Sequence, residues 1–344
     1  MDTSKYTLNV YITHFTPPKR KRTDWIKYFI TSRANFGYIR SWARLLKHGT
    51  RGNQPWKKDV MTSVRAKDYK NRYQYLYQVL TELNRIKVKN INIKIFSNSN
   101  EVKIELERLN QLNNVQFYIY ENYSKMNVIH NSPWNNNDSR SPWLLTWEHK
   151  KIMIDNINNA DEDSLFLYIE NDMKFTQKNL DYWIEAREKL KETKLIPSFV
   201  RIEYSEIRPG WLAIDHFGGS PSKISDLPKF ESQQDIFIQL PNPYCAMYLL
   251  DLPLAIEYSN SKAFTEKDSR EISGWDIGAR AAMGLQFVDI PQNFTSRHVI
   301  PVEKGAEYCE ILGSAVLHHL PNLYCQVPQI EKNFLSIHHV VLNK

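Results

Sequence analysis

Ser164-Leu165-Phe166-Leu167-Tyr168-Ile169-Glu170-Asn171-Asp172 is the stretch of this 344-residue chain that decides the fold. Apart from the Tyr168 hydroxyl, no polar side chain follows Ser164 until Glu170. Such a run is typical of a central parallel strand that is covered on both faces. The run ends abruptly in two carboxylates, and open α/β folds bind ligands at the carboxyl ends of their parallel strands. We therefore expect a functional site at the end of this strand.

The segments around this strand alternate between strand and helix patterns. Strands are predicted over 8–13, 90–96, 115–120 and 164–169, and helices over 73–86, 101–113, across 144–152, over 178–191 and over 275–283. Strands separated by helices indicate βαβ units. After residue 191 the pattern changes to short strands with Pro and Gly turns. We expect one α/β domain over 1–344, with a mostly parallel central sheet flanked by helices and a mixed C-terminal half.

Composition excludes several classes of protein. Hydrophobic residues make up 42% and aromatic residues 12% of the chain, which is too apolar for a disordered protein. No stretch approaches the roughly 18 apolar residues of a membrane span. Cys245, Cys309 and Cys325 have no C-x-x-C spacing, so they predict neither a zinc site nor a disulfide framework. The chain opens with polar residues instead of an apolar leader, so we expect a reducing, cytoplasmic compartment.

Basic residues are concentrated in one segment. Residues 19–72 hold 16 Lys and Arg against three Asp, a local charge of +13, and the total of +7 therefore leaves −6 for the rest. Trp25, Phe29, Phe36 and Trp42 interleave with these charges, which predicts one or two amphipathic helices followed by a loop. A positive field attracts the phosphates of a nucleotide, a lipid head group or a nucleic acid. A solvated surface that aids solubility is the plainer interpretation.

The two carboxylates at the strand end suit a metal. In an extended chain, Glu170 and Asp172 lie on the same side, about 7 Å apart. Two such oxygen ligands can hold Mg²⁺ or Mn²⁺, which then takes its remaining ligands from water and substrate phosphates. The alternative is an acidic turn that caps the next helix.

The strand order and the Glu170-Asn171-Asp172 tripeptide resemble the GT-A class of metal-dependent glycosyltransferases, whose sheet is Rossmann-like. In that class a D-x-D or E-x-D motif at the end of a central strand binds a divalent metal and the diphosphate of a sugar nucleotide. The stretches 145–150 and 196–203 are similar to a poorly characterised branch of the superfamily. The resemblance covers roughly residues 6–325. It implies a nucleotide-sugar-binding half (6–175) with a basic insert (17–71), an acceptor-binding half (176–325) and a tail (326–344).

The resemblance also implies roles for individual residues. Asp172 is expected to ligate the metal, and Glu170 to face the ribose or a metal-bound water. The expected contacts of the donor and any cofactor are Thr13, Ser97, Lys150, Glu170 and Asn171. The expected contacts of the acceptor are Arg201, Glu203, Trp211, Asp215, Tyr244 and Trp275, for which an aromatic patch in the core is the alternative.

A histidine near the C-terminus often completes such a metal site, and imidazole suits borderline ions such as Mn²⁺. The candidates are His298, His318 and His319. We favour His319, because its neighbours look ordered whereas those of His298 look like a loop.

Asp276 is the candidate general base. It lies in Ser273-Gly274-Trp275-Asp276-Ile277-Gly278, at the start of the predicted late helix, where inverting enzymes of the class place an Asp or Glu beside a Trp. The alternative is an acidic residue in a first helical turn, which the helix dipole favours for structural reasons alone. If the enzyme retains configuration, Asp276 binds the sugar without acting as a base.

The leading hypothesis is a hexosyl- or pentosyltransferase of glycan biosynthesis. It would move sugar from a UDP- or GDP-sugar to a hydroxyl of a glycan or lipid-linked acceptor, with residues 19–72 in peripheral contact with an anionic membrane. The alternative is a basic protein that binds nucleic acid or anionic membrane without catalysis. A pure binder has no use for the acidic strand end, so nucleic acid is the less favoured partner. A nucleotidyltransferase ranks last, because Thr13–Pro18 lacks the expected glycines.

Overall fold

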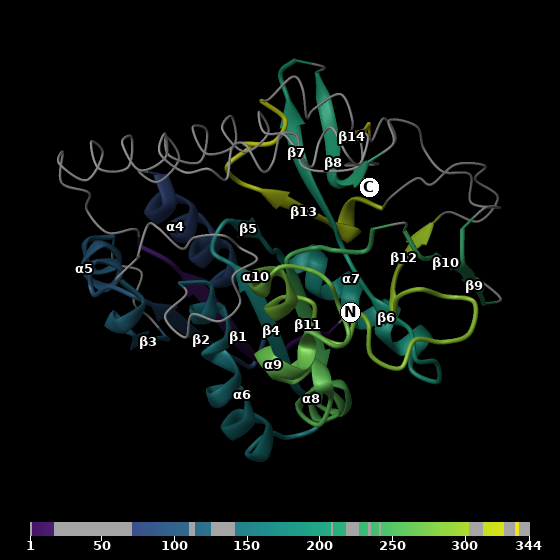
Figure 1. The fold of residues 1–344 in the computed structure, drawn as a ribbon, viewed down its shortest axis with the longest axis horizontal. Helices are drawn as coiled ribbons and strands as arrows, with labels where there is room; N and C mark the ends of the chain where they lie inside the picture. The colour runs from purple at the N-terminus through teal and green to yellow at the C-terminus, as the bar shows by residue number, and fades with distance from the viewer. Residues whose placement is uncertain are drawn as a thin grey trace, which may run out of the picture.

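The computed structural model describes residues 2–16, 71–109, 114–124, 142–207, 209–217, 227–232, 235–240, 242–302, 312–326 and 334–336. Within these ranges the chain is an α/β protein with mixed sheets and helices (Figure 1). The amphipathic helices predicted for the basic segment lie outside the described residues. No helix of the described part is long and apolar enough to cross a membrane.

The first sheet contains the strand that ends in the acidic tripeptide. Its order is β11-β4-β1-β2-β3. The strands are β1 (Thr7–His14), β2 (Asn90–Ser97), β3 (Val115–Ile119), β4 (Ser164–Glu170) and β11 (Met247–Asp251). The first four are parallel, and β11 is antiparallel to β4. Thr13 pairs with Glu170 on one side and with Phe96 on the other, so three strands end at one edge.

Seven α-helices are described, and several of them cover this sheet. They are α4 (Arg72–Leu83), α5 (Glu101–Arg108), α6 (His149–Asn158), α7 (Gln177–Leu190), α8 (Leu252–Ser259), α9 (Glu266–Ser269) and α10 (Ile277–Ala281). α6 packs against β1 and α8, and α8 also packs against β4 and β11. Short 3₁₀ helices span Glu121–Ser124, Pro142–Trp147, Lys262–Phe264 and Gly313–Ala315.

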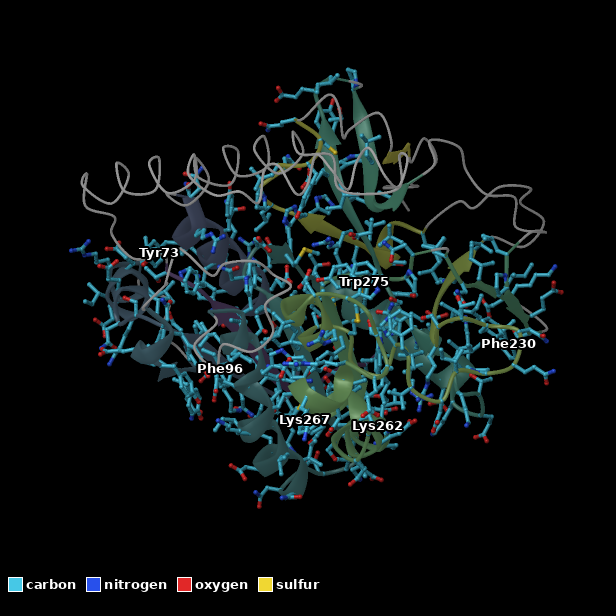
Figure 2. The ribbon with its side chains drawn as sticks, viewed as in Figure 1. Tyr73, Phe96, Phe230, Lys262, Lys267 and Trp275 are labelled. Carbon is cyan, nitrogen blue, oxygen red and sulfur yellow. The ribbon has the colours of Figure 1, made fainter. Side chains whose placement is uncertain are left out.

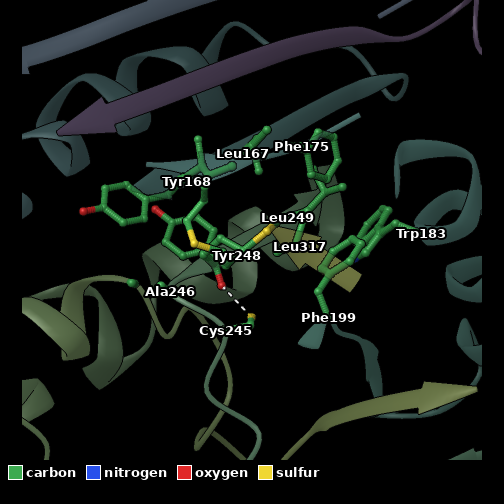
Figure 3. Close-up of a cluster of buried hydrophobic side chains, with 14 of the residues drawn as sticks. Leu167, Tyr168, Phe175, Trp183, Phe199, Cys245, Ala246, Tyr248, Leu249 and Leu317 are labelled. Atoms are coloured by element: carbon green, nitrogen blue, oxygen red, sulfur yellow. Dashed lines mark hydrogen bonds between the residues drawn. The ribbon is translucent and has the colours of Figure 1, made fainter. Parts of the chain in front are cut away.

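The core lies where the first sheet, α7 and the C-terminal strands meet. Figure 3 shows Leu167 of β4 and Leu249 of β11 in one buried cluster with Trp183 of α7. All residues of β4 before Glu170 are buried, as the apolar run 165–169 predicts. Burial of side chains of this size stabilises the fold by roughly 1.5–3 kcal/mol each.

Two smaller sheets complete the fold. One has the order β6-β12-β10-β9, with β6 (Ile196–Pro197), β9 (Lys229–Glu231), β10 (Ile236–Ile238) and β12 (His298–Val302). The other has the order β14-β8-β7-β13-β5, with β5 (Met173–Lys174), β7 (Val200–Ser205), β8 (Gly210–Phe217), β13 (Val316–His319) and β14 (Phe334–Ser336). In Figure 1, β7 and β8 rise at the top, and β9, β10 and β12 lie at the right.

The acidic tripeptide connects two sheets. β4 ends at Glu170, and β5 begins at Met173 in the third sheet, where it pairs antiparallel with β13. In this register His319 lies opposite Met173. At the start of β13, the Asn179 amide of α7 donates hydrogen bonds to the carbonyls of Ser314 (2.8 Å) and Val316 (2.9 Å). α7 therefore fixes the strand that brings His319 to the acidic end of β4.

The structure confirms the order of predicted elements and corrects several bounds. The helix predicted across 144–152 is a 3₁₀ helix, Pro142–Trp147, followed by α6. The late helix is α10 alone, because Asp276 caps it and Gly284 adopts a positive φ of 56° shortly after it ends. The chain turns at 171–172, so the extended geometry expected for Glu170 and Asp172 is wrong. β11 belongs to the first sheet, so residues of both predicted halves share one sheet.

Candidate functional site

A pocket of about 490 Å³ opens at the carboxyl ends of β1 and β4. Trp275, which lines it, lies near the middle of the molecule in Figure 2. The pocket brings together ten of the side chains expected from the sequence: Thr13, Glu170, Asn171, Asp172, Arg201, Asp215, Tyr244, Trp275, Asp276 and His319. They come from β1, the end of β4, β7, β8, the segment before β11, the start of α10 and the end of β13. The fold thus assembles one site from segments that lie far apart in the sequence.

Asp172 and His319 face each other across the β5–β13 pair. Nε2 of His319 lies 3.5 Å from Oδ2 of Asp172. The backbone holds this arrangement, because the Leu320 N–H donates a 2.9 Å hydrogen bond to the Asp172 carbonyl. The other carboxylate oxygen, Oδ1 of Asp172, is buried and has no hydrogen-bond partner within the described part of the chain. A buried polar atom without a partner is costly and needs an explanation.

Glu203 lies behind His319 and not in the pocket. Its side chain is fully buried on β7, and Oε1 is hydrogen-bonded to Nδ1 of His319. Oε2 accepts a 2.8 Å hydrogen bond from the Cys325 N–H. The expectation that Glu203 contacts an acceptor is therefore not supported by its position, since neither oxygen reaches the pocket.

Tyr324 covers the other side of His319. The two rings stack with centroids 5.5 Å apart and an interplanar angle of 29°. The chain returns Tyr324 to this place by a turn in which Asn322 has a φ of 50°, a conformation that Asn tolerates better than most residues. Oδ1 of Asn322 accepts a 3.1 Å hydrogen bond from the Tyr204 N–H of β7. Glu203 and Tyr324 together hold the His319 ring on two sides.

The carboxylates shift the pKa values of this cluster. Burial acts to lower the pKa of His319, but Asp172 and Glu203 outweigh it and raise that pKa to about 10. Burial acts to raise the pKa of Asp172, but the adjacent His319 outweighs this effect, so the pKa of Asp172 is lowered. Burial, helped by the charge of Asp172, raises the pKa of Glu170 to about 7. Neighbouring groups with such opposed shifts are typical of functional sites.

The donor set of the cluster suits a divalent cation. No group of three or more His, Cys, Asp or Glu side chains among the described residues is arranged as a metal site. Asp172 and His319 nevertheless offer an oxygen without a hydrogen-bond partner and a ring nitrogen close to the same carboxylate. Mg²⁺ and Mn²⁺ sites often use only one or two protein ligands and fill the rest with water and phosphate oxygens. These two residues therefore fit a cation that is shared with a substrate.

Arg201 and Asp215 pair with each other. Nε and Nη2 of Arg201 donate hydrogen bonds of 2.7 Å to the two carboxylate oxygens of Asp215, and both side chains are buried. The guanidinium lies 5.0 Å from the centre of the Tyr244 ring. The Asn242 amide also donates to the Asp215 carbonyl at 2.8 Å. This closed ion pair forms a rigid polar wall of the pocket.

An aromatic wall stands beside this ion pair. Tyr244 and Trp275 stack with ring centroids 5.1 Å apart and an interplanar angle of 19°. The Tyr244 hydroxyl lies 3.5 Å from Oε1 of Glu170. Trp275 keeps 36% of its surface exposed, and Nη1 of Arg280 donates a 2.9 Å hydrogen bond to its carbonyl. The two stacked rings thus line the pocket, and Arg280 fixes the segment that carries Trp275.

Asp276 caps α10 and also lines the pocket. Its Oδ1 accepts a 2.9 Å hydrogen bond from the Ala279 N–H, so Asp276 has the structural role of an N-cap and precedes the first helical turn in which the sequence placed it. Among the described residues no hydrogen bond engages Oδ2, and the side chain is exposed in the pocket. Trp147 also holds the start of α10, because its Nε1 donates a 2.8 Å hydrogen bond to the Ile277 carbonyl. The helix cap therefore also fixes the orientation of this carboxylate.

Two of the residues expected to contact the donor lie away from the pocket. Lys150 is buried at the start of α6, where Nζ is hydrogen-bonded to the Tyr258 hydroxyl and lies 4.0 Å from the centre of the Trp147 ring. Burial lowers the pKa of this lysine well below its ordinary value. Ser97 is buried at the end of β2, where its Oγ accepts from the Ser99 N–H at 3.3 Å. Both residues support the fold beside the site.

Two further expected residues are also elsewhere. His298 does not line the pocket: it begins β12, is buried, and its Nδ1 lies 3.3 Å from the Ser198 hydroxyl. The prediction of a loop around His298 is therefore wrong for the residues that follow it, because they form β12. Trp211 lies on β8, where its ring packs against His318 with centroids 4.6 Å apart. Of the three candidate histidines, only His319 reaches Asp172.

The pocket also contains side chains that the sequence did not single out. They include Phe15, Arg72, Trp143, Tyr168 and Tyr324. Arg72 begins α4 at the end of the basic segment, and its Nη1 donates a 3.2 Å hydrogen bond to the Phe15 carbonyl. The Pro321-Asn322 pair is a turn signal that predicts a chain reversal after His319, which would have pointed to Tyr324.

Comparison with protein-family models found no family that matches this sequence, and a search of curated proteins found no match either.

Proposed function

We propose that this protein is a metal-dependent glycosyltransferase of the GT-A type, which moves a sugar from a nucleotide-sugar donor to an acceptor hydroxyl. One observation carries the proposal: the Asp172–His319 pair and the Asp276 carboxylate line the same pocket at the carboxyl edge of a parallel sheet. The Asp172–His319 pair suits the binding of a metal-bound diphosphate. The Asp276 carboxylate suits the removal of a proton from a hydroxyl.

The donor side of the pocket is the end of β1 and β4. Thr13 and Glu170 are paired across these two strands, and Asn171 is held by a 2.7 Å hydrogen bond from its amide to Nδ1 of His14. Burial lowers the pKa of His14 to about 3, so this ring is neutral and can accept that bond. The edge thus offers fixed polar groups for the ribose and phosphates of a nucleotide.

Asp172 and His319 would hold the metal, through Oδ1 or Oδ2 and Nε2. When bound, the metal supplies positive charge that offsets the charge developing on the leaving diphosphate. Arg72 lines the same end of the pocket and adds a permanent positive charge beside Asp172. Glu170 reaches toward the Tyr244 hydroxyl and faces the space between the donor and acceptor ends.

Oδ2 of Asp276 would take the proton of the acceptor hydroxyl. Oδ1 would keep its hydrogen bond from the Ala279 N–H. A positioned base of this kind contributes typically 10²–10⁴-fold to a rate. Trp275 and Tyr244 would present a ring face to the sugar or acceptor, and the Arg201–Asp215 pair would keep that wall rigid. If configuration is retained, the same Asp276 oxygen binds a sugar hydroxyl instead.

The proposal is tested by nucleotide release from a panel of UDP- and GDP-sugars in the presence of Mn²⁺. Activity is expected with at least one donor and is lost when a chelator is added. Full activity in excess chelator would exclude the metal, and no release from any donor with any tested glycan or lipid-linked acceptor would reject glycosyl transfer. The alternative of a basic binding protein depends on residues 19–72, of which 19–70 lie outside the described residues, and it stays a prediction.

A further inference from the structure

Glu203 is a fully buried carboxylate whose two oxygens have different partners. Oε1 is hydrogen-bonded to Nδ1 of His319, and Oε2 accepts from the main-chain N–H of Cys325 at 2.8 Å. A buried carboxylate is costly unless its oxygens are satisfied. Both oxygens of Glu203 have hydrogen-bond partners, so its side chain is kept in one orientation in the centre of β7.

This arrangement determines which nitrogen of His319 carries a proton. An ionised carboxylate only accepts hydrogen bonds, so Nδ1 of His319 must be the donor to Oε1. The proton on Nδ1 remains whether the ring is neutral or charged. Nε2, on the opposite side of the ring, is the atom that lies 3.5 Å from Oδ2 of Asp172.

We propose that Glu203 is a positioning residue that holds a proton of His319 on Nδ1 and thereby leaves Nε2, which faces Asp172, as the ring nitrogen that gives up its proton when a metal binds. The metal-binding consequence of this inference rests on the proposed function. A ring nitrogen binds a metal only through its electron pair, and ligating histidines usually donate their other N–H to a carboxylate. Glu203 thus serves the metal without touching it or the substrate.

Glu203→Gln inverts this geometry with almost no change of shape. The Cys325 N–H still needs an acceptor, so the amide oxygen of the new side chain must lie there. The amide NH₂ then faces Nδ1 of His319, which must accept, so the neutral ring keeps its single proton on Nε2. In that tautomer, Nε2 has no electron pair to offer.

The experiment uses full-length protein labelled with ¹⁵N-histidine, in which the His319 signals are assigned by their loss in His319→Gln. In the wild type, with or without Mg²⁺, Nδ1 is expected to show the ¹⁵N shift of a protonated ring nitrogen. In Glu203→Gln, Nδ1 of His319 is expected to show the ¹⁵N shift of a ring nitrogen without a proton. Mn²⁺ affinity, measured by electron paramagnetic resonance, is expected to fall about 10–100-fold in the variant, the usual effect of losing such a partner.

Glu148→Gln is the matched control, because Glu148 is also buried, accepts a 2.7 Å hydrogen bond from the Tyr123 hydroxyl, and does not line the pocket. It is expected to leave both the His319 signals and Mn²⁺ affinity unchanged. A protonated Nδ1 in Glu203→Gln, or unchanged Mn²⁺ affinity beside a metal-binding wild type, would overturn the inference.

Two outcomes separate this inference from the proposed function. If the wild type binds no Mn²⁺, the proposed function fails, and the Nδ1 signals alone decide the role of Glu203. If Glu203→Gln does not fold, the wild-type spectrum decides: a bare Nδ1 in the Mg²⁺-loaded protein overturns the inference, and a protonated one supports it.

Discussion

Nε2 of His319 lies 3.5 Å from Oδ2 of Asp172, although one residue follows the fourth strand of the chain and the other ends the thirteenth. The contact is a product of strand pairing, because β13 runs antiparallel to the two residues of β5 that immediately follow Asp172. The acidic strand end therefore meets its imidazole partner through backbone hydrogen bonds as well as through charge.

Asp172→Asn tests the role of this pair. The amide keeps the shape of the side chain but removes its charge, so Mn²⁺ affinity and Mn²⁺-dependent nucleotide binding are expected to fall at least tenfold by calorimetry. The melting temperature should change little, because Glu203 still pairs with His319. Asp163→Asn is the control, since Asp163 pairs with Lys5 on the surface. Loss of folding in Asp172→Asn would favour a purely structural acidic turn.

Asp276→Asn separates helix capping from catalysis. Asn caps helices about as well as Asp, so stability should stay within a few tenths of a kcal/mol. The transfer rate is expected to fall about 10²-fold or more while the donor KM is kept, because an amide cannot take the hydroxyl proton. Asp276→Ala should lose the rate and, in addition, about 1 kcal/mol of stability. A weakened donor affinity in Asp276→Asn would instead make this residue a sugar ligand.

Gly284→Ala is expected to destabilise the protein by about 2–5 kcal/mol. Gly284 has a φ of +56°, and a Cβ there would lie 2.9 Å from Cβ of Tyr248 on β11. The left-handed backbone costs a residue with a Cβ about 1–2 kcal/mol, and overpacking adds about 1–3 kcal/mol. Gly274→Ala is the matched control, because nothing lies within 4 Å of its added Cβ. Chemical denaturation of both variants measures the difference, and equal stabilities would contradict the described turn.

Stability should fall with acid as the buried His298 resists protonation. Burial lowers the pKa of His298 to about 4, against 6.5 for an exposed histidine. Between pH 6.5 and 4 the unfolded chain therefore binds the proton that the folded protein excludes, and this contribution is lost as the pH falls. The loss is on the order of 3 kcal/mol at pH 4. His298→Gln should flatten the dependence of unfolding free energy on pH in this window, and an unchanged slope would exclude the effect.

Membrane recruitment through the basic segment makes a separate prediction. If residues 19–72 bind an anionic surface, the attraction is electrostatic and must weaken as salt is added. Replacing Lys19, Arg20, Lys21 and Arg22 with Ser should then reduce binding to phosphatidylserine vesicles and leave donor hydrolysis intact. Vesicle affinity that is unchanged and insensitive to salt would reject recruitment by this cluster.

The strand that carries the acidic tripeptide could be predicted from sequence because its cause is local. An apolar run that ends in two carboxylates predicts both the burial of 165–169 and the half-buried strand end at Glu170. The spacing of apolar residues, which alternates between helix and strand patterns along the chain, likewise predicts the helices and strands around this strand. The resemblance identifies Asp276 by its place beside a Trp at the start of a predicted helix, and that place is also why it caps α10.

The burial of Glu203, Lys150 and Ser97 could not be predicted in this way. Partners from distant segments surround two of them: His319 and Cys325 for Glu203, and Tyr258 for Lys150. A polar residue near a sheet edge looks the same in sequence whether it faces a ligand or a partner beneath it. The turn at Asn171 was missed for the opposite reason, because it depends on β5 leaving the first sheet for another.

The β5–β13 pairing also sets an order of events during synthesis of the chain. The chain leaves the ribosome N-terminus first, at about 5–20 residues per second. Once residue 251 has emerged, all five strands of the first sheet are present, and so is the acidic tripeptide. His319 is translated much later, so until then Met173 and Lys174 have no β13 to pair with. A chain that stops anywhere between Asp276 and His319 would carry the candidate base but no completed metal pair, so on the proposed function premature termination in this interval is expected to leave the protein inactive.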